Sequence, residues 1–438
     1  MRRVCLLTTA VLATACSMVA AQESLTLAAA IDKARSANPA VIAARAGEQE
    51  AAARVRQAQA GWLPRVDFVE GVQRGDLPIY VFGSLLSQRR FTEANFGVDA
   101  LNHPDPLTNY RASATLQHAL FNADVQTGIR SARVARDLAV VGRDATDRDL
   151  ALEATRAFGR VLTAVAAHRA SVAAVAAAEE DARRTRDRRD AGLVTEADVL
   201  ALDVHLAQMK ARVIDADAQR GIAMAALSRT VGGPLDRQYA LETPVAATAV
   251  GADTLSALED AAVKTRPEAH RAALQERLAG VQHAGARQTF LPQLGWQGGY
   301  EWNGADFTDR AGGWMVGAEV RVNVFRGFAD RARLAEAASA VTRAGAERAL
   351  TESGIRLEVR TAWLRLEAAR ARLAVGAATV AQARESQRIL RDRYEAGLAN
   401  VGDVLRAAQA LLDAELQNTS AQVDVVIESA ALDRAVGR

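Results

Sequence analysis

The fold is decided by residues 186–200, RDRRDAGLVTEADVL, because a close copy returns at 391–405 as RDRYEAGLANVGDVL. The two stretches are 205 positions apart, far beyond the period of about 20 to 50 residues that is typical of solenoid repeats. Each stretch has a central Ala-Gly-Leu turn between helix-forming segments. The chain therefore repeats one structural element at a very long distance.

Two further motifs indicate that the repeat is a duplicated half of the protein. Residues 62–64, WLP, return at 290–292 as FLP, and Asn38-Pro39 returns as Arg266-Pro267. These pairs are 228 positions apart, so the first half holds about 23 more residues between its motifs and its glycine turn. We expect two structural repeats, at 22–248 and 249–438.

The composition favours long helices over ordinary globular domains. Of 438 residues, half are apolar but only 5% are aromatic, and alanine and arginine fill long stretches. Such alanine-rich, charge-interleaved sequence favours helix. The net charge of +2 gives no strong field that would attract nucleic acid, so no nucleic-acid partner is expected.

The N-terminus has the features of an export signal over residues 1–21. Arg2 and Arg3 precede an apolar stretch, and the small residues 19–21 suit a cleavage site. A lipoprotein signal that modifies Cys16 is a second possibility. Both cysteines, Cys5 and Cys16, lie in this segment, so cleavage after residue 21 would leave no disulfide or thiolate site. Beyond residue 21 we expect no apolar run long enough for a membrane-spanning helix.

Period-two alternation predicts a β-hairpin in each half. In the second half, strands are expected on both sides of a turn near 303–313, within a hairpin at 292–325. The first half has its counterpart at 65–119. Each strand has one apolar and one polar face, as a membrane barrel needs. Aromatic residues expected at the membrane interface are Tyr110, Trp296, Tyr300, Trp302 and Trp314. A soluble hairpin packed on a helix is the alternative.

The extra residues of the first half fall between its two strands. The segment 75–106 contains Asp76-Leu77-Pro78 and His103-Pro104-Asp105-Pro106. We expect an elaborated loop there, with a structural or extracellular role.

Very long helices follow both hairpins, at about 122–190 and 327–395, and neither contains a proline. In the second, residues from Val359 to Tyr394 follow the 3-4 spacing of a heptad seam, with large residues alternating with small ones. About 70 residues make roughly 100 Å of helix, which suits a rod or the wall of a tunnel. Tip turns at 191–195 and 396–400 then lead into shorter return helices, expected at about 196–230 and 401–436.

Four strands in one chain cannot close a membrane barrel, because the smallest such barrels have eight. An open sheet in lipid would leave unpaired backbone groups at its edges, and hydrocarbon does not tolerate these. Several chains must therefore share one barrel. Two chains would give eight strands and three would give twelve, and the residues alone do not choose between them.

Taken in order, these features resemble the TolC-like outer-membrane efflux protein family over about residues 23–436. They include Asn38-Pro39, Leu63-Pro64, Phe121-Asn122 after the hairpin, and the repeated Gly-Leu…Asp-Val turn. The resemblance implies a mainly α fold with duplicated long-helix hairpins that form an α-barrel. Its four strands would join a twelve-stranded β-barrel of a homotrimer in the outer membrane of a Gram-negative bacterium.

The implied function is that of a passive exit duct in a tripartite efflux or type I secretion system. The partners would be a periplasmic adaptor, an inner-membrane transporter and outer-membrane lipid. The resemblance implies adaptor-contacting tips at Gly192, Leu193, Val194, Gly397, Leu398 and Ala399, and a tunnel entrance with Asp198, Asp403 and Arg406.

Two of these positions depart from the family pattern. Arg406 stands where a second acidic residue would be expected, and Ala399 replaces an arginine that helps to latch the entrance in some relatives. In the plainer interpretation, the two glycines cap helices, the leucines pack between them, and both aspartates are helix-capping carboxylates.

Enzymatic interpretations lack a motif. None of the six histidines lies in an HExxH pattern or a tight cluster of metal ligands, and no phosphate-binding glycine loop or Gly-x-Ser-x-Gly turn is present. We therefore expect no enzyme, cofactor or metal. A periplasmic coiled-coil adaptor or a structural protein without a barrel remains the alternative function. The cargo cannot be read from the sequence.

Overall fold

The computed structural model describes residues 23–242 and 254–438. The predicted export signal at 1–21, with Cys5 and Cys16, lies outside the described residues, as does most of the linker before 254. The chain divides into two compact units. The first comprises Met1–Val41, Asp147–Asp253 and Thr361–Arg434, and the second comprises Ile42–Thr146, Thr254–Arg360 and Ala435–Arg438. Several long helices contribute residues to both units.

The helical segment that precedes each β-hairpin is divided in two at a proline. In the first half, β1 (Glu23–Leu25) precedes α1 (Leu27–Ala37) and α2 (Pro39–Ala60). In the second half, α7 (Leu255–Thr265) and α8 (Pro267–Gln288) follow β4 (Tyr239–Leu241), which pairs in parallel with β1. Proline removes an amide donor and fixes φ, which explains both breaks.

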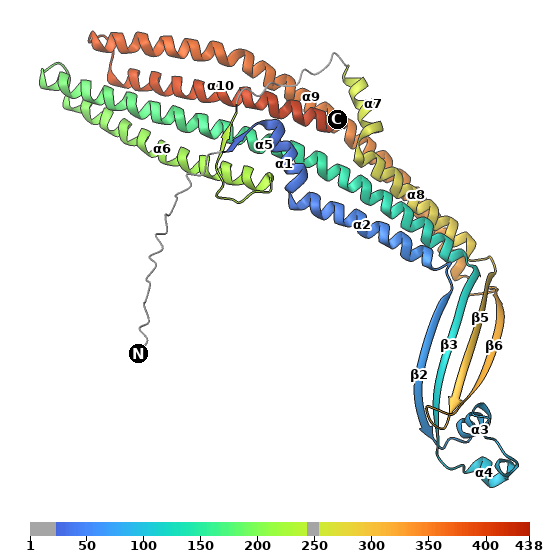
Figure 1. The fold of residues 1–438 in the computed structure, drawn as a ribbon. Coiled ribbons are helices and arrows are strands. Elements are labelled where there is room, and N and C mark those ends of the chain that lie inside the picture. The colour runs from blue at the N-terminus through green and yellow to red at the C-terminus, as the bar shows by residue number, and fades with distance from the viewer. Residues whose placement is uncertain (1–22, 243–253) are drawn as a thin grey trace, which may run out of the picture. The chain divides into compact units, whose positions relative to one another are not determined.

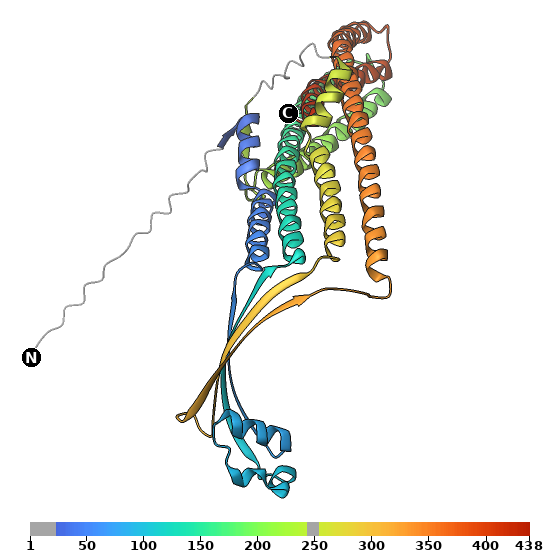
Figure 2. The ribbon, with the colours of Figure 1, turned by 90° about the vertical axis from the view of Figure 1, so that its right-hand side faces the viewer.

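The four long strands form one antiparallel sheet in the second unit (Figures 1 and 2). Its order is β2 (Arg65–Gly75), β3 (Leu107–Phe121), β5 (Gln293–Gly304) and β6 (Arg310–Arg321). The expected turn at 303–313 is shorter than predicted, because paired strand residues extend to Gly304 and resume at Arg310. The two hairpins are joined through the pairing of β3 with β5.

The insertion between β2 and β3 is not the loop that the sequence led us to expect. It contains α3 (Pro78–Ser87), the 3₁₀ helix η1 (Glu93–Phe96) and α4 (Val98–Asn102). Pro78 starts α3 because proline suits a first helical position, where no amide hydrogen bond is lost. Phe91 packs edge-on against both Phe82 and Phe96, with ring centroids 4.8 and 5.1 Å apart, which gives the insertion a small aromatic core.

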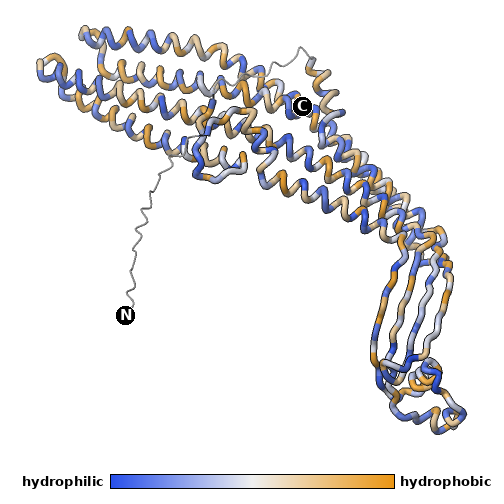
Figure 3. The backbone as a smooth tube through the Cα atoms, viewed as in Figure 1, coloured by the Kyte–Doolittle hydropathy of each residue, from blue (hydrophilic) through white to orange (hydrophobic). Residues whose placement is uncertain are grey.

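Two long helical hairpins follow the strands. They are α5 (Ala123–Asp190) with α6 (Glu196–Thr230), and α9 (Ala329–Glu395) with α10 (Val401–Val436). Between 364 and 390 of α9, the residues that are not exposed are 366, 369, 373, 376, 380, 383, 387 and 390. This is the predicted 3-4 seam, and Figure 3 shows hydrophobic residues interspersed along these helices.

One helix is more apolar than we expected from the sequence. Within α5, an 18-residue stretch has a mean hydropathy of 1.5, enough to cross a membrane by length and composition alone, and only 17% of it is buried. The expectation that no such run exists beyond residue 21 is therefore wrong for α5. Alanine and valine dominate its residues 161–178. Because small residues also allow helices to approach closely, one such helix is weak evidence for a span.

A glycine clasp repeats in both halves, and the sequence motifs did not reveal it. Gly232, with φ +78°, follows α6, and a Cβ there would lie 2.7 Å from the Ala37 carbonyl oxygen. Beside it, the Asn38 amide donates to the Thr230 carbonyl oxygen over 2.9 Å. Each return helix thus ends against the proline break of its own half.

The second clasp lies 205 positions later. Gly437, with φ +86°, would bring a Cβ to 2.6 Å from Thr265 Oγ1, and that hydroxyl donates to the Val436 carbonyl oxygen over 2.7 Å. A positive φ and a close backbone approach both favour glycine at these two positions.

We predict that Gly232→Ala lowers the free energy of unfolding by on the order of 1–3 kcal/mol, because alanine would be strained at this φ and would contact Ala37. Thermal or denaturant unfolding monitored by circular dichroism would measure the change. Gly221→Ala is the matched control, since Gly221 lies in α6 where a Cβ would point into open space, and alanine there should stabilise by roughly 0.5–1 kcal/mol. Equal changes in the free energy of unfolding for the two variants would contradict the proposed role of Gly232 in the glycine clasp.

Candidate functional site: a two-faced sheet and paired helical tips

Strand register divides the sheet into an apolar face and a polar face. Opposite residues share a face, so Val66, Leu116, Gly298 and Val316 form one row of the apolar face. The next row joins Phe68, Ala114, Tyr300 and Trp314. The strands have 11 to 15 residues, whereas a membrane-spanning β-strand needs about 9–11.

The five predicted interface aromatics lie on this apolar face. Trp296 is opposite His118 and Ala318, toward the strand ends that join the helices. Trp302 and Tyr110 lie nearer the insertion, and Tyr300 and Trp314 are opposite each other between them. Trp314 is 76% exposed, so its indole ring is not part of a core within this chain.

The polar face has a ladder of side-chain amides. Asn109 Nδ2 donates to Asn303 Oδ1 over 2.7 Å, and Gln88 Nε2 donates to Asn109 Oδ1 over 2.9 Å. All three residues are 5% exposed. Further along, Arg111 forms an ion pair of 2.6 Å with Glu301. Because Gln88 directly follows α3, the ladder anchors the insertion to the polar face of the sheet.

The outer strands leave their outer edges open. Within the described residues, β2 pairs only with β3 and β6 pairs only with β5. Each outer edge therefore presents backbone amides and carbonyls that have no strand partner in this chain.

The first helical tip is closed by a glycine turn and a capping box. Gly192 has φ +72°, and the amide of Leu193 donates to the Arg188 carbonyl oxygen over 2.9 Å. Asp198 accepts hydrogen bonds from the backbone amide and the hydroxyl of Thr195, over 3.0 and 2.8 Å. Asp198 is thus a capping carboxylate, as the plainer interpretation predicted. Val194 lies in the turn between them and is partly exposed.

The second tip has the same turn but a different cap. Gly397 has φ +74°, and the amide of Leu398 donates to the Arg393 carbonyl oxygen over 2.8 Å. Here Asn400 caps the helix, because its side-chain oxygen accepts from the Asp403 amide over 2.9 Å. The Asp403 carboxylate forms an ion pair with Arg406. The prediction that Asp403 is a helix-capping carboxylate is therefore wrong.

An arginine joins the two tips within one chain. The Arg188 guanidinium of α5 lies 5.1 Å from the centroid of the Tyr394 ring of α9. Its nitrogens also donate to the carbonyl oxygens of Tyr394 and Glu395, over 3.4 and 3.3 Å. Nearby, Arg391 pairs with Asp181 at 3.1 Å. We call the contact of Arg188 with Tyr394 and Glu395 the tip clasp.

Two other arginines near the first tip share a carboxylate of their own helix, and one of them, Arg184, also lies 3.7 Å from the Glu395 carboxylate of α9. Arg183 and Arg184 hydrogen-bond to Glu180 and hold the pKa of that carboxyl down at about 2. Arg183 also pairs with Asp187 at 3.2 Å. The tip clasp was not predicted from the sequence, because Arg188 is one of several similar arginines between 183 and 189 and the spacing does not show which one stacks on Tyr394.

The sheet and the tips are the candidate functional surfaces, and no metal site accompanies them among the described residues. Among residues 23–242 and 254–438, no group of three or more His, Cys, Asp or Glu side chains is placed to hold a metal ion. His168 lies 3.9 Å from Asp217 and is partly buried.

The comparisons with known proteins agree with this geometry. The model of the outer membrane efflux protein family matches residues 30–233 and 258–438. Among solved structures, the Campylobacter jejuni CmeC outer membrane channel has 16% identity and a TM-score of 0.81, covering 94% of this chain and 85% of that one. VceC from Vibrio cholerae has 19% identity and a TM-score of 0.75, covering 94% and 96%. No curated protein matches the chain.

A mainly helical chain with long helical hairpins and a two-faced, four-stranded antiparallel sheet defines a TolC-like outer-membrane channel. The chain belongs to the outer membrane efflux protein family. It is a non-enzymatic efflux channel of the outer membrane of a Gram-negative bacterium. The predicted fold class, function and location are confirmed, and the adaptor or structural-protein alternative is not supported.

Proposed function

We propose that three copies of the chain close one twelve-stranded barrel, with β6 of each copy pairing with β2 of the next. The observation that carries this proposal is the pair of open edges on a sheet with one apolar face. In lipid, each unpaired backbone group would cost several kcal/mol, so sister strands must cover the edges. The apolar face would contact lipid, and the polar face, with its amide ladder, would line the pore.

The helical tips would form the entrance and dock on a periplasmic adaptor. Leu193 and Leu398 are 68% and 70% exposed at the ends of their hairpins. Exposed leucines at a helical turn suit a hydrophobic contact with another helical protein. The adaptor would connect the duct to an inner-membrane transporter that supplies the energy, in an efflux or type I secretion assembly.

The tip clasp would hold the entrance closed in place of the arginine that Ala399 replaces. Arg188 joins the two hairpins by a stacking contact and two hydrogen bonds to carbonyls at the end of α9. A cation there also complements the helix dipole. The Asp403–Arg406 ion pair would offset the acidic charge at the entrance and weaken its preference for cations.

We expect cysteines on the facing edges of β2 and β6 to form disulfides between copies. Pairs drawn from positions 66, 68, 70 and 72 of β2 and 312, 314, 316 and 318 of β6 place both thiols on the apolar face. Matched pairs should give covalent trimers on non-reducing gels of outer membranes. Pairs that combine one position from each face, such as 68 with 315, are the control. Covalent dimers as the end product, or no cross-linking at any pair, would contradict a shared trimeric barrel.

A photo-cross-linking residue at position 193 or 398 should capture the periplasmic adaptor in whole cells, since these side chains are the exposed apolar groups of the tips. Mass spectrometry of the cross-linked product would identify the partner. Leu364 of α9 is the matched control, because it is also exposed but lies more than 30 residues from the turn. Equal capture at 364 would show that the tips are not the docking surface.

Arg188→Ala should raise single-channel conductance in planar bilayers, because it removes the stacking contact and both hydrogen bonds of the tip clasp and leaves the ion pairs Asp181–Arg391 and Arg184–Glu395 between the hairpins near the tips. Arg183→Ala removes the same charge but only contacts within α5, and it should leave conductance near that of the unsubstituted channel. If both variants conduct alike, the tip clasp is not the closing contact.

A salt gradient in the same recordings tests the charge at the entrance. We expect a reversal potential near zero. A strongly cation-selective reversal potential would contradict the proposed effect of Arg406.

A further inference from the structure

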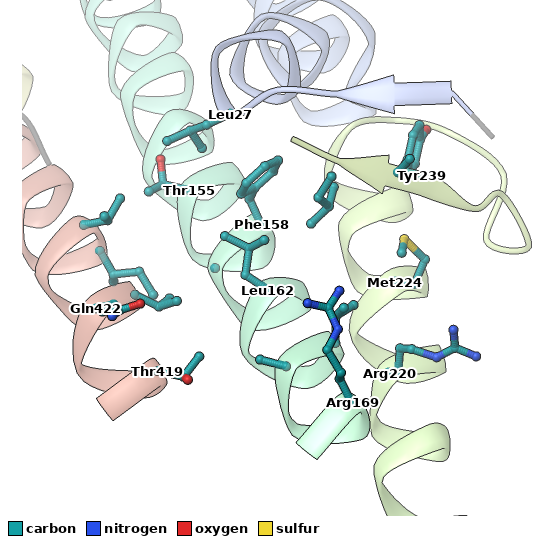
Figure 4. A pocket seen from close by; sticks show the side chains of 18 of the residues that line it. Leu27, Thr155, Phe158, Leu162, Arg169, Arg220, Met224, Tyr239, Thr419 and Gln422 are labelled. Carbon is teal, nitrogen blue, oxygen red and sulfur yellow. The ribbon is translucent and has the colours of Figure 1, made fainter. Parts of the chain in front are cut away.

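A cavity of about 700 Å³ lies within the first unit, between α5, α6, β4 and α10 (Figure 4). Its wall is mainly apolar and includes Phe158, Leu162, Met224, Leu241 and Ile427. The volume is in the range of about 300–1,000 Å³ that is typical of small-molecule sites. None of its lining residues belongs to the four-stranded sheet or to the tip turns, so its ligand can be tested separately from the proposed gate.

The wall of the cavity is held in place where α5 packs against its neighbours. At Gly159, α5 approaches α10 so closely that a Cβ would lie 2.7 Å from Val423 Cγ1. Phe158 beside it belongs to the buried cluster that joins α5 to α6 and to the short parallel strands. The walls are therefore fixed by the core of the unit.

The charges around the cavity have one sign. Among its lining residues, the charged side chains are Arg169 and Arg220, and none is acidic. Arg220 pairs with Asp217 at 2.7 Å, and Figure 4 shows its side chain extending away from the cavity. The Arg169 side chain instead runs back along α5 toward Leu162. Arg169 is exposed to solvent at the mouth of the cavity, and within the part of the chain that the structure describes its side chain has no hydrogen bond or ion pair.

We propose that this cavity binds a single-chain anionic amphiphile, a fatty acid, with its carboxylate on Arg169. The acyl chain would lie along Phe158, Leu162 and Met224, where apolar contact removes it from water. A guanidinium binds a carboxylate through two parallel hydrogen bonds, which a neutral or cationic head group cannot reproduce. One unpaired cation beside one apolar cavity fits a ligand with one charge and one chain better than a two-chain phospholipid.

The test compares three probes with the same twelve-carbon tail and different head groups, namely dodecanoate, dodecyl maltoside and dodecyltrimethylammonium. Full-length protein in lipid nanodiscs would be titrated with each probe below its critical micelle concentration, against a fluorescent fatty acid as reporter. Dodecanoate should displace the reporter at the lowest concentration. Because a charge-assisted hydrogen bond contributes about 1.5–3 kcal/mol, Arg169→Gln should weaken dodecanoate binding by about tenfold or more.

Two further variants distinguish binding at the cavity from partition of the probe into the lipid of the nanodisc. Arg160→Gln is the matched control, because Arg160 is exposed on the same helix and does not line the cavity. It should bind dodecanoate as the unsubstituted protein does. Ala166→Phe should fill the cavity and abolish binding of the reporter while circular dichroism shows an intact helical fold. Equal affinity for the three head groups, unchanged binding by Arg169→Gln, or binding no stronger than in Ala166→Phe would each overturn the proposal. The last result would mean that a neighbouring copy or another part of the chain covers the cavity.

Discussion

A backbone amide in hydrocarbon has no water to bind, and this constraint governs the outer edges of β2 and β6. The sheet has strands long enough to cross a membrane and a face on which valine, phenylalanine and tryptophan follow one another in register. That face is stable against lipid, but the edges are not. The described residues contribute four strands to this sheet and leave both outer edges without a strand partner, which is why we propose that other copies of the chain complete it. The need for assembly thus arises from the backbone, before any side chain at a subunit interface is considered.

The helical part of the chain is governed by a different constraint, which is the close approach of neighbouring helices. Its seam in α9 alternates large and small residues, and glycine recurs where another element comes nearest. A methyl group would meet Val423 at Gly159, the Ala37 carbonyl at Gly232 and the Thr265 hydroxyl at Gly437. Substitutions at such positions are costly because packed interiors have little free volume. Helices built from small residues can therefore pack closely over a great length, while a few glycines fix where the chain turns back.

Much of this architecture could be predicted from the sequence. The long helices lack proline, and their ends are marked by a repeated glycine turn, so α5, α6, α9 and α10 begin and end within about two residues of expectation. Local signals of this kind are strong because they act on the backbone directly. The insertion was predicted less well. Its loop-like prolines flank an apolar segment, Pro78–Ser87, that is helical because it packs on the ends of the strands through Gln88 and Tyr80.

The candidate site shows the same division between local and tertiary information. The turn residues and the Thr195–Asp198 cap follow from spacing alone. The roles of Asp403 and Arg188 do not, because each depends on which neighbour a flexible side chain reaches. Asp403 is drawn to Arg406 once Asn400 provides the cap, and Arg188 reaches a ring on another helical hairpin.

Single differences between the two repeats decide how the tips contact each other. Tyr394 occupies the position that Arg189 has in the first repeat, and Arg189 contacts Asp190 and Glu196 near its own turn. Tyr394 instead provides the ring and the carbonyl for Arg188. If position 394 held an arginine, as position 189 does, Arg188 would face a second cation in place of a ring. The difference between the repeats at this position therefore provides an attractive contact between the hairpins, and further differences give one tip a capping carboxylate and the other an ion pair. In a channel built from several copies, the entrance would alternate between these two kinds of tip, so its charge and its closing contacts would be set by the differences between the repeats and not by the motif that they share.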